Sequence, residues 1–235
     1  MLTPTRQVCP RSATLNGVQP ERNGSIDAVI FGLGGVLLDW NPRYLYRKLF
    51  DDEEAMERFL REVCTMQWHE ANDRGVPFEV TCAQLAAEHP EHAEHIWAWG
   101  TRTEEMVGGP IEGTVAILRE LIDGGAVRVF ALTNMEAHTY PLRRERYEFL
   151  GWFEGTVVSS AEGVIKPDPR IFEVLLERFG LDAGSTLMID DSARNVAAAR
   201  ELGMPTVLFE SPEALRAQLE AAGVLAPRAG STAAG

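Results

Sequence analysis

The sequence has few of the features that mark secreted, membrane-embedded or disulfide-stabilised proteins. Its three cysteines, Cys9, Cys64 and Cys82, show neither paired nor metal-ligand spacing, so we expect a reduced, cytoplasmic protein. No apolar run approaches the roughly 18 residues needed to span a bilayer. Residues 1–24 contain no apolar segment of the kind found in signal peptides. The sequence therefore favours a globular protein without membrane spans or disulfides.

Positive charge is also scarce. Lysine and arginine total 22 against 35 aspartates and glutamates, which gives a formal net charge of −13. Nucleic acids and anionic membranes are bound through net positive charge, so we expect neither as a partner. A small phosphorylated metabolite remains compatible, because a few local cations and a metal ion can reverse the field inside a cleft. We expect a monomer or a weak dimer.

Short apolar runs alternate with helical patterns along most of the chain. The expected strands are residues 26–31, 128–132, 156–159, 186–190 and 206–209. The expected helices lie near residues 112–123, 138–149, 169–179, 193–202 and 212–222. Strands that alternate with helices of this length form a parallel sheet covered on both faces. The predicted fold class is therefore α/β, with a doubly wound parallel sheet.

Residues 40–106 break the alternation, because they show helical periodicity and no convincing strand. We expect an all-helical cap over the carboxyl ends of the strands, where ligands bind in open parallel sheets. Its polar residues Gln67, Trp68, His69, Glu70 and Asp73 could contact a substrate. The predicted division is a core of residues 25–39 and 107–225, a cap of residues 40–106, and disordered tails at residues 1–24 and 226–235.

Two adjacent carboxylates, Asp190 and Asp191, follow an apolar strand. Neighbouring carboxylates at the end of a strand repel each other unless a cation lies between them, and Mg²⁺ is the hard ion that prefers such oxygen ligands. The alternative is that Asp191 or Ser192 caps the following helix. The two roles are compatible.

Three further residues are candidates for holding a phosphate group. Lys166 lies in a loop stiffened by two prolines and can act as a point charge on phosphate oxygens. Thr133 and Asn134 end a strand and offer a hydroxyl and an amide. The alternatives are an exposed surface lysine and an ordinary strand-to-turn exit.

Residues 32–37, Gly-Leu-Gly-Gly-Val-Leu, form a glycine-rich turn after the first strand. The turn lacks the dinucleotide-binding fingerprint and the lysine and hydroxyl residue of a P-loop, so we reject both. Trp40 follows and is expected at the pocket mouth, although an aromatic residue at such a junction can also serve packing alone.

The order and spacing of these segments resemble the four motifs of the haloacid dehalogenase superfamily, most of whose members are magnesium-dependent phosphatases. The resemblance spans roughly residues 26–210 and includes a helical cap between the first two motifs. It implies a Rossmann-like core, a Mg²⁺ cofactor and two sets of ligands. The phosphate ligands would be Thr133, Asn134 and Lys166, and the metal ligands would be Asp190, Asp191 and the backbone carbonyl of Gly34.

The sequence departs from this family at Gly32, where the family has an aspartate that attacks phosphorus and also binds the metal. Glycine can do neither, and Gly34 removes the usual general acid or base. Asp27 lies five residues earlier, roughly 16 Å away along an extended strand. Asp39 lies beyond the turn. Loss of a covalent nucleophile costs on the order of 10⁶ in turnover in other enzymes.

The predicted function is that of a haloacid dehalogenase-like hydrolase, by lineage a Mg²⁺-dependent phosphatase of small phosphorylated metabolites, impaired at Gly32. The first alternative is a non-catalytic descendant that binds a phosphorylated ligand or a partner protein. A second is that Gly32 is an introduced substitution in an active enzyme. Dehalogenation of 2-haloacids is the least favoured function, because the resemblance implies that it needs the same aspartate and no metal.

Overall fold

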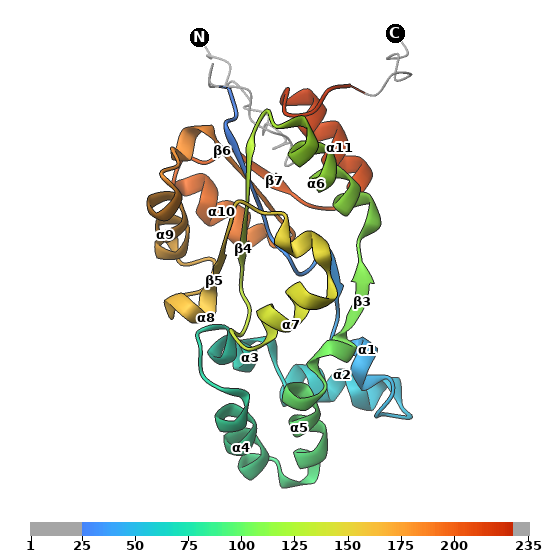
Figure 1. Cartoon of the computed structure of the whole chain (residues 1–235). Coiled ribbons are helices and arrows are strands. Elements are labelled where there is room, and N and C mark those ends of the chain that lie inside the picture. The colour runs from blue at the N-terminus through green and yellow to red at the C-terminus, as the bar shows by residue number, and fades with distance from the viewer. Residues whose placement is uncertain (1–24, 228–235) are drawn as a thin grey trace, which may run out of the picture.

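A five-stranded parallel sheet forms the centre of the molecule in the computed structural model, which describes residues 25–227 (Figure 1). The order across the sheet is β5-β4-β1-β6-β7. The bounds are β1 (Ala28–Phe31), β4 (Arg128–Thr133), β5 (Gly155–Val158), β6 (Thr186–Asp190) and β7 (Thr206–Leu208). The predicted doubly wound α/β fold is confirmed. The tails predicted to be disordered lie outside the described residues, except for Ala226 and Pro227.

Strand β1 lies between β4 and β6 and is buried along its whole length. Successive side chains of a strand point to opposite faces, so Val29 and Phe31 join one hydrophobic cluster while Ala28 and Ile30 join another. The first cluster includes side chains from α6 (Glu112–Gly124) and α11 (Pro212–Ala221). The second includes side chains from α9 (Pro169–Phe179) and α10 (Ala193–Glu201). Both faces of the sheet are therefore covered. The connections also hold α7 (Thr139–Arg146), η3 (Glu148–Gly151), α8 (Ser159–Glu162) and η4 (Ala183–Ser185).

The chain between β1 and β4 contains a helical segment with its own hydrophobic cluster, in which Tyr46, Phe59 and Trp99 are fully or almost fully buried. Figure 1 places this segment at one end of the molecule, beyond the carboxyl ends of the strands. Its elements are α1 (Arg43–Tyr46), α2 (Glu53–Glu62), α3 (Met66–Asp73), α4 (Phe78–Glu88), η1 (Pro90–His92), α5 (Ala93–Thr101) and η2 (Thr103–Met106).

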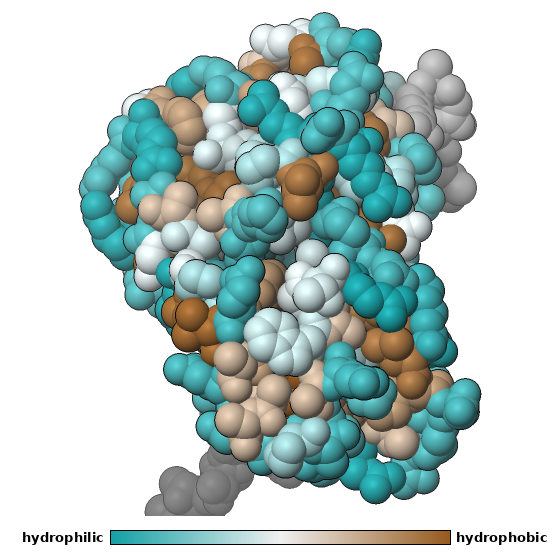
Figure 2. All heavy atoms as spheres, turned by 60° about the horizontal axis from the view of Figure 1, so that its bottom comes forward, coloured by the Kyte–Doolittle hydropathy of each residue, from teal (hydrophilic) through white to brown (hydrophobic). Residues whose placement is uncertain are grey.

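The surface of the helical end is mixed in polarity on the face that Figure 2 shows. Figure 2 brings this end forward and shows hydrophobic residues interspersed with hydrophilic ones. Across residues 25–227, no helix has both the length and the apolar character needed to cross a membrane.

Two short strands that the sequence analysis did not predict connect the helical segment to the core. Strands β2 (Leu38–Trp40) and β3 (Val107–Pro110) pair antiparallel, with a register shift between Asp39 and Trp40. The prediction failed because β3 has the sequence Val-Gly-Gly-Pro, and glycine and proline are depleted in strands. The pairing with β2, not local propensity, holds this segment extended. Trp40 therefore belongs to the connecting ribbon.

The helical segment also contacts the core directly where α3 ends. Ser159 Oγ, at the start of α8, donates a hydrogen bond to the backbone oxygen of Asp73 (2.6 Å). Gly75 has φ +102°, and a Cβ there would lie 2.8 Å from the backbone oxygen of Ser160. This close approach requires glycine, both for its backbone conformation and for space.

Gly75→Ala should therefore lower the free energy of unfolding by about 1–3 kcal/mol, the cost of a strained left-handed backbone. Urea denaturation measures this. Gly124→Ala is the matched control, because Gly124 lies in a helix and a Cβ there meets no atom within 4 Å. The control should be neutral or slightly stabilising, since alanine favours helix. Equal effects of the two substitutions would show that the contact at Gly75 is not needed.

Candidate active site

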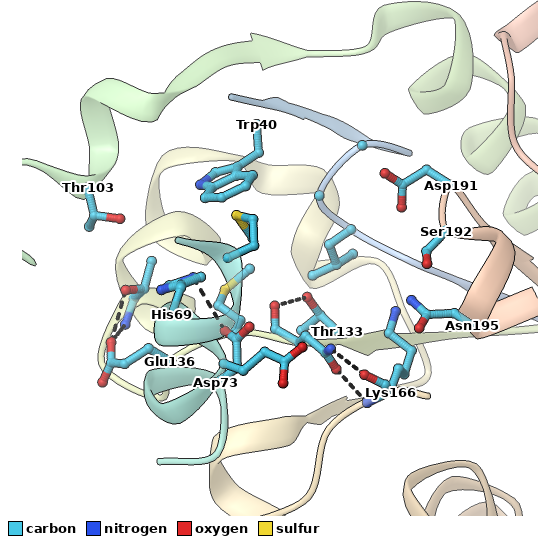
Figure 3. Close-up of a pocket in the computed structure, with 18 of the residues that line it drawn as sticks. Trp40, His69, Asp73, Thr103, Thr133, Glu136, Lys166, Asp191, Ser192 and Asn195 are labelled. Atoms are coloured by element: carbon cyan, nitrogen blue, oxygen red, sulfur yellow. Dashed lines mark hydrogen bonds and ion pairs between the residues drawn. The ribbon is translucent and has the colours of Figure 1, made fainter. Parts of the chain in front are cut away.

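A cavity of about 310 Å³ lies between the carboxyl ends of the strands and the helical segment. In Figure 3, Lys166, Asp191, Ser192 and Asn195 gather on one side of this pocket, and His69 lies on the other. Brändén's rule for open parallel sheets places ligands at this edge. The cavity is lined by residues of both the core and the helical segment, including Gly34, Trp40, Asp73, Thr133, Asn134, Arg143, Lys166 and Asp191.

The centre of the core side is a buried ion pair between Lys166 and Asp190. Their Nζ and Oδ2 atoms are 2.6 Å apart, and the side chains are 5% and 1% exposed. The ammonium also donates to the backbone oxygen of Leu132 (2.8 Å). Lys166 is one of only two lysines in the sequence, the other being Lys48. An ammonium group has three donors, so these two contacts leave one N–H for a ligand.

Both carboxylate oxygens of Asp190 have protein partners. Oδ2 accepts from Lys166, while Oδ1 accepts from the backbone N–H of Ser192 (2.9 Å) and from Nδ2 of Asn195 (2.8 Å). Asn195 lies on the first turn of α10, and the sequence analysis did not identify it. The feature that could have identified Asn195 is its position, five residues after Asp190 and within the first turn of the helix that follows the strand. Asp190 is thus held in place from two sides.

Gly32 lies beside this ion pair. It is buried, and its N–H donates to the backbone oxygen of Ile189 (2.8 Å), which continues the contact of β1 with β6. A Cβ at position 32 would lie 3.1 Å from Asp190 Oδ2 and 3.4 Å from Val36. A side chain here would therefore point at the Lys166–Asp190 pair. Because the residue is glycine, no side chain from position 32 contacts that pair.

Thr133 and Asn134 lie next to Lys166. Asn134 exchanges two hydrogen bonds with the backbone of Lys166, since its Nδ2 donates to Lys166 O (2.9 Å) and its Oδ1 accepts from Lys166 N (2.8 Å). The amide of Asn134 therefore orients the lysine loop. Thr133, at the end of β4, is 2% exposed and lines the cavity, and within residues 25–227 its hydroxyl makes a long hydrogen bond to Asn134 O (3.4 Å).

Of the two adjacent aspartates, Asp191 is the one that lines the cavity. Partial desolvation raises its pKa, the charge of Asp190 raises it further, and Lys166 opposes the shift. Its Oδ2 approaches Gly35 so closely that a Cβ there would lie only 2.1 Å away, and Gly35 has φ +73°. Gly35 therefore provides the space in which this carboxylate sits.

The donor set fits a magnesium ion only in part. Within residues 25–227 no three histidine, cysteine, aspartate or glutamate side chains are grouped to hold a metal. Asp190 is committed to protein donors and Gly32 has no oxygen on a side chain. Asp191 and the carbonyl of Gly34 remain, and Mg²⁺ often binds through one or two carboxylates together with water and substrate phosphate. The site suits an ion that arrives with a phosphate group.

The opposite wall carries a histidine surrounded by aromatic rings. Trp99 Nε1 donates to His69 Nδ1 (3.1 Å), and the rings of Trp40 and Phe78 lie nearly parallel to the imidazole at centroid distances of 5.9 and 6.0 Å. Burial and the charge of Arg143 lower the pKa of His69 to about 4. A neutral ring that accepts at Nδ1 carries its proton on Nε2. Trp40 thus lines the cavity and also packs.

Asp73 completes this wall. Its side chain is 9% exposed, and its Oδ1 is 3.7 Å from His69 Nε2, which is too long for a hydrogen bond. Burial raises the pKa of Asp73 to about 7, and Glu70 adds to the shift, whereas the cations Lys166, Arg143 and Arg74 oppose it. Arg143 also lines the cavity.

The structure brings most of the predicted site residues together. Lys166, Thr133 and Asn134 lie within one cluster with Asp190 and Asp191, and Gly32, Gly34 and Trp40 border the same cavity or cluster. Sequence reasoning missed Arg143 and Asn195, because an arginine or asparagine on a helix gives no sign of which way its side chain points. It named Asp73 only among several polar residues of the helical segment.

A protein-family model for haloacid dehalogenase-like hydrolases matches residues 26–203. The chain is 28% identical over 177 residues to the sesquiterpene phosphatase astK of Aspergillus oryzae, a match that covers 75% of this chain and 86% of that protein. It is 39% identical over 66 residues to the glyceraldehyde 3-phosphate phosphatase of Pyrococcus abyssi, with 28% of each chain covered.

The fold is similar to that of the HAD family enzyme BT-2542 of Bacteroides thetaiotaomicron. One solved structure, of an aspartate-to-alanine mutant in complex with magnesium and inorganic phosphate, has a TM-score of 0.58 and 21% sequence identity. The match covers 80% of this chain and 95% of that one. At this level of identity the likeness shows the fold.

The raised pKa of Asp73 predicts that this carboxyl destabilises the protein at high pH. Below about pH 4 the group is protonated in both the folded and the unfolded chain and has no effect. Between about pH 4 and pH 7 only the unfolded chain ionises, so stability falls as the pH rises, and above pH 7 the penalty is constant. Relative to the native protein, Asp73→Asn should therefore gain up to about 4 kcal/mol between pH 4 and pH 8.

Urea denaturation of both proteins at several pH values measures this. Asp51→Asn, which removes an exposed carboxylate from the helical segment, controls for the loss of one negative charge. A difference between Asp73→Asn and the native protein that is the same at pH 4 and pH 8 would contradict the prediction.

Proposed function

Because the chain belongs to the haloacid dehalogenase-like hydrolase family, we propose that its cavity binds the phosphoryl group of a small phosphate ester and hydrolyses the ester poorly or not at all. The single observation that carries this proposal is the contrast at the strand ends. Lys166 and Asp190 are fully ordered by protein contacts, whereas position 32 beside them has no side chain.

Binding of the phosphoryl group rests on the donors that protein contacts leave free. Lys166 retains one N–H toward the cavity, and the Thr133 hydroxyl lies at the same edge. Hydrogen bonds from an ammonium to phosphate oxygens are charge-assisted and strong. The two relatives that are phosphatases support an ester as the ligand class.

Asp191 and the Gly34 carbonyl are the groups that would hold Mg²⁺. When bound, the ion would neutralise phosphate charge and so strengthen binding beside two carboxylates. An enzyme of similar fold in complex with magnesium and inorganic phosphate supports these two as the ligands to test. Asp190 would act through Lys166, which it orients and whose charge it partly balances.

Turnover is expected to be poor because no group can attack phosphorus from position 32. The remaining side chains can stabilise developing charge, which alone supports a residual rate in other enzymes. The same vacancy argues against dehalogenation, which by the family resemblance uses the same carboxylate. A purely protein-binding role is less favoured, because it gives no reason for the free donor of Lys166, a side chain that is only 5% exposed.

Inorganic phosphate should shift the NMR signal of Lys166 and leave that of Lys48 unchanged. The chain has only two lysines, so protein labelled with ¹³C at the lysine ε-carbon gives two assignable signals, and exposed Lys48, paired with Glu105, is an internal control. Titration with phosphate gives the affinity. We expect Mg²⁺ to lower the dissociation constant of phosphate by about tenfold or more, which is the effect of one charge-assisted contact.

Asp191→Ala should abolish the effect of Mg²⁺ while phosphate still shifts the Lys166 signal. If saturating phosphate leaves Lys166 unshifted with and without Mg²⁺, the proposed phosphate site is wrong. If Mg²⁺ tightens binding equally in Asp191→Ala, the metal does not bind through this carboxylate.

Gly32→Asp should raise the rate of hydrolysis of an aryl phosphate in the presence of Mg²⁺, on the order of 10³-fold or more, because a nucleophile is restored. The new Cβ would lie 3.1 Å from Asp190 Oδ2, a contact that needs a shift of a few tenths of an ångström. Gly32→Asn is the matched control, since it has nearly the same size and no carboxylate.

The control should remain as inactive as the native protein. A native protein already as active as Gly32→Asp would contradict our account of the missing nucleophile. No gain in a Gly32→Asp variant that still binds phosphate would show that turnover is limited by more than this residue.

A further inference from the structure

Three acidic residues that line the cavity, Glu70, Asp73 and Glu136, have no role in the proposed phosphate site, and of these Asp73 is the buried one. It belongs to the helical segment, whereas the phosphate ligands belong to the core, and it faces the cavity between them. In Figure 3 it lies between His69 and the end of the pocket that holds Thr133 and Lys166.

The position is unfavourable for a carboxyl group in three ways. The side chain is 9% exposed, and its Oδ1 is buried without any hydrogen-bond partner in the part of the chain that the structure describes. A buried polar atom without a partner destabilises the folded protein. Asp73 is also the last residue of α3, and the negative end of a helix dipole disfavours an anion. Such costs at a cavity wall are typical of functional positions.

The surroundings fix the position of Asp73 without giving the carboxyl a partner. Ser159 Oγ donates to its backbone oxygen (2.6 Å), and the close approach of Gly75 to Ser160 secures the following turn. His69, whose Nδ1 accepts from Trp99, stands 3.7 Å from Oδ1. The carboxyl is therefore held ready in front of the cavity before any ligand arrives.

We propose that Asp73 is a specificity-determining residue that hydrogen-bonds a hydroxyl group on the carbon skeleton of the phosphate ester. This inference rests on the proposed function, because it assumes that the phosphoryl group lies at Lys166. The ligand class is then a small hydroxylated phosphate ester, which suits a cavity of about 310 Å³.

A hydroxyl fits this place better than a charged group. Arg143 and Lys166 act on Asp73 as positive charges from the core side, and they would repel an ammonium group on the ligand. A second anion on the ligand would meet Asp73 itself and nearby Glu70. A hydroxyl can donate to an ionised carboxyl and accept from a protonated one, so it is bound in either state of Asp73.

The test compares phosphate esters that differ only in hydroxyl groups. Glycerol 3-phosphate is paired with n-propyl phosphate, and glycerol 2-phosphate with isopropyl phosphate, so that hydroxyls are presented at two distances from phosphorus. Dissociation constants are measured with Mg²⁺ by calorimetry and by the Lys166 signal. In the native protein at least one hydroxylated ester should bind about tenfold or more tightly than its partner, the value of a hydrogen bond to a charged group.

Asp73→Ala should bring this ratio close to one while the affinity for the two alkyl phosphates changes less than about twofold, since those contacts are with the core. Retained binding of alkyl phosphates also shows that the variant is folded. Asp73→Asn, which keeps the shape and can still hydrogen-bond a hydroxyl, should keep most of the preference. Glu79→Ala removes an exposed negative charge from the helical segment and should leave the ratio unchanged.

The outcomes separate the two proposals. Equal binding of all four esters by the native protein, or a preference that survives in Asp73→Ala, overturns the role of Asp73 and leaves the phosphate site standing. If neither inorganic phosphate nor any ester binds, the proposed function fails and this inference fails with it.

Discussion

The buried ion pair between Lys166 and Asp190 is the interaction around which the site is organised. Moving two charges out of water is costly, and such a pair seldom stabilises a fold relative to apolar side chains of similar size. It is tolerated here because both partners make further hydrogen bonds, Lys166 to Leu132 O and Asp190 to Ser192 and Asn195, so that only one N–H of the ammonium is left for a ligand. The pair joins the loop after β5 to the end of β6, and so sets the floor of the cavity.

This ion pair explains why the two adjacent aspartates have different surroundings. Asp190 accepts hydrogen bonds from the protein, whereas Asp191 lies in the space that Gly35 provides. Burial and the neighbouring charge of Asp190 raise the pKa of Asp191. With no side chain at position 32, Lys166 has no second carboxylate to neutralise. The net charge of the floor is then one negative unit from Asp191, which favours the joint arrival of a cation and a phosphate group over phosphate alone.

The sequence predicted the parts of this arrangement that depend on the order of residues along strands. Apolar runs located β4 and β6, and the residues that end these strands, Thr133 and Asp190, had to meet at one edge of a parallel sheet. It could not predict β3, because Gly108 and Gly109 carry no strand signal and the segment is extended by its pairing with β2. It also could not single out Asn195 or Asp73, since the direction of a helical side chain depends on how the helix packs.

The two halves of the cavity differ in how much they depend on a ligand. On the core side Lys166, Asp190 and Asn134 are held in position by hydrogen bonds within the protein, so this half of the cavity is formed before a ligand binds. On the helical side Asp73 is buried and stands at the unfavourable end of α3, and its Oδ1 has no hydrogen-bond partner among residues 25–227. A ligand that supplies this missing hydrogen bond would remove a destabilising feature of the unliganded protein, and this would favour binding. Selectivity is therefore expected to arise where the helical segment meets the core, and not at the phosphate ligands themselves, which would treat all phosphate esters alike.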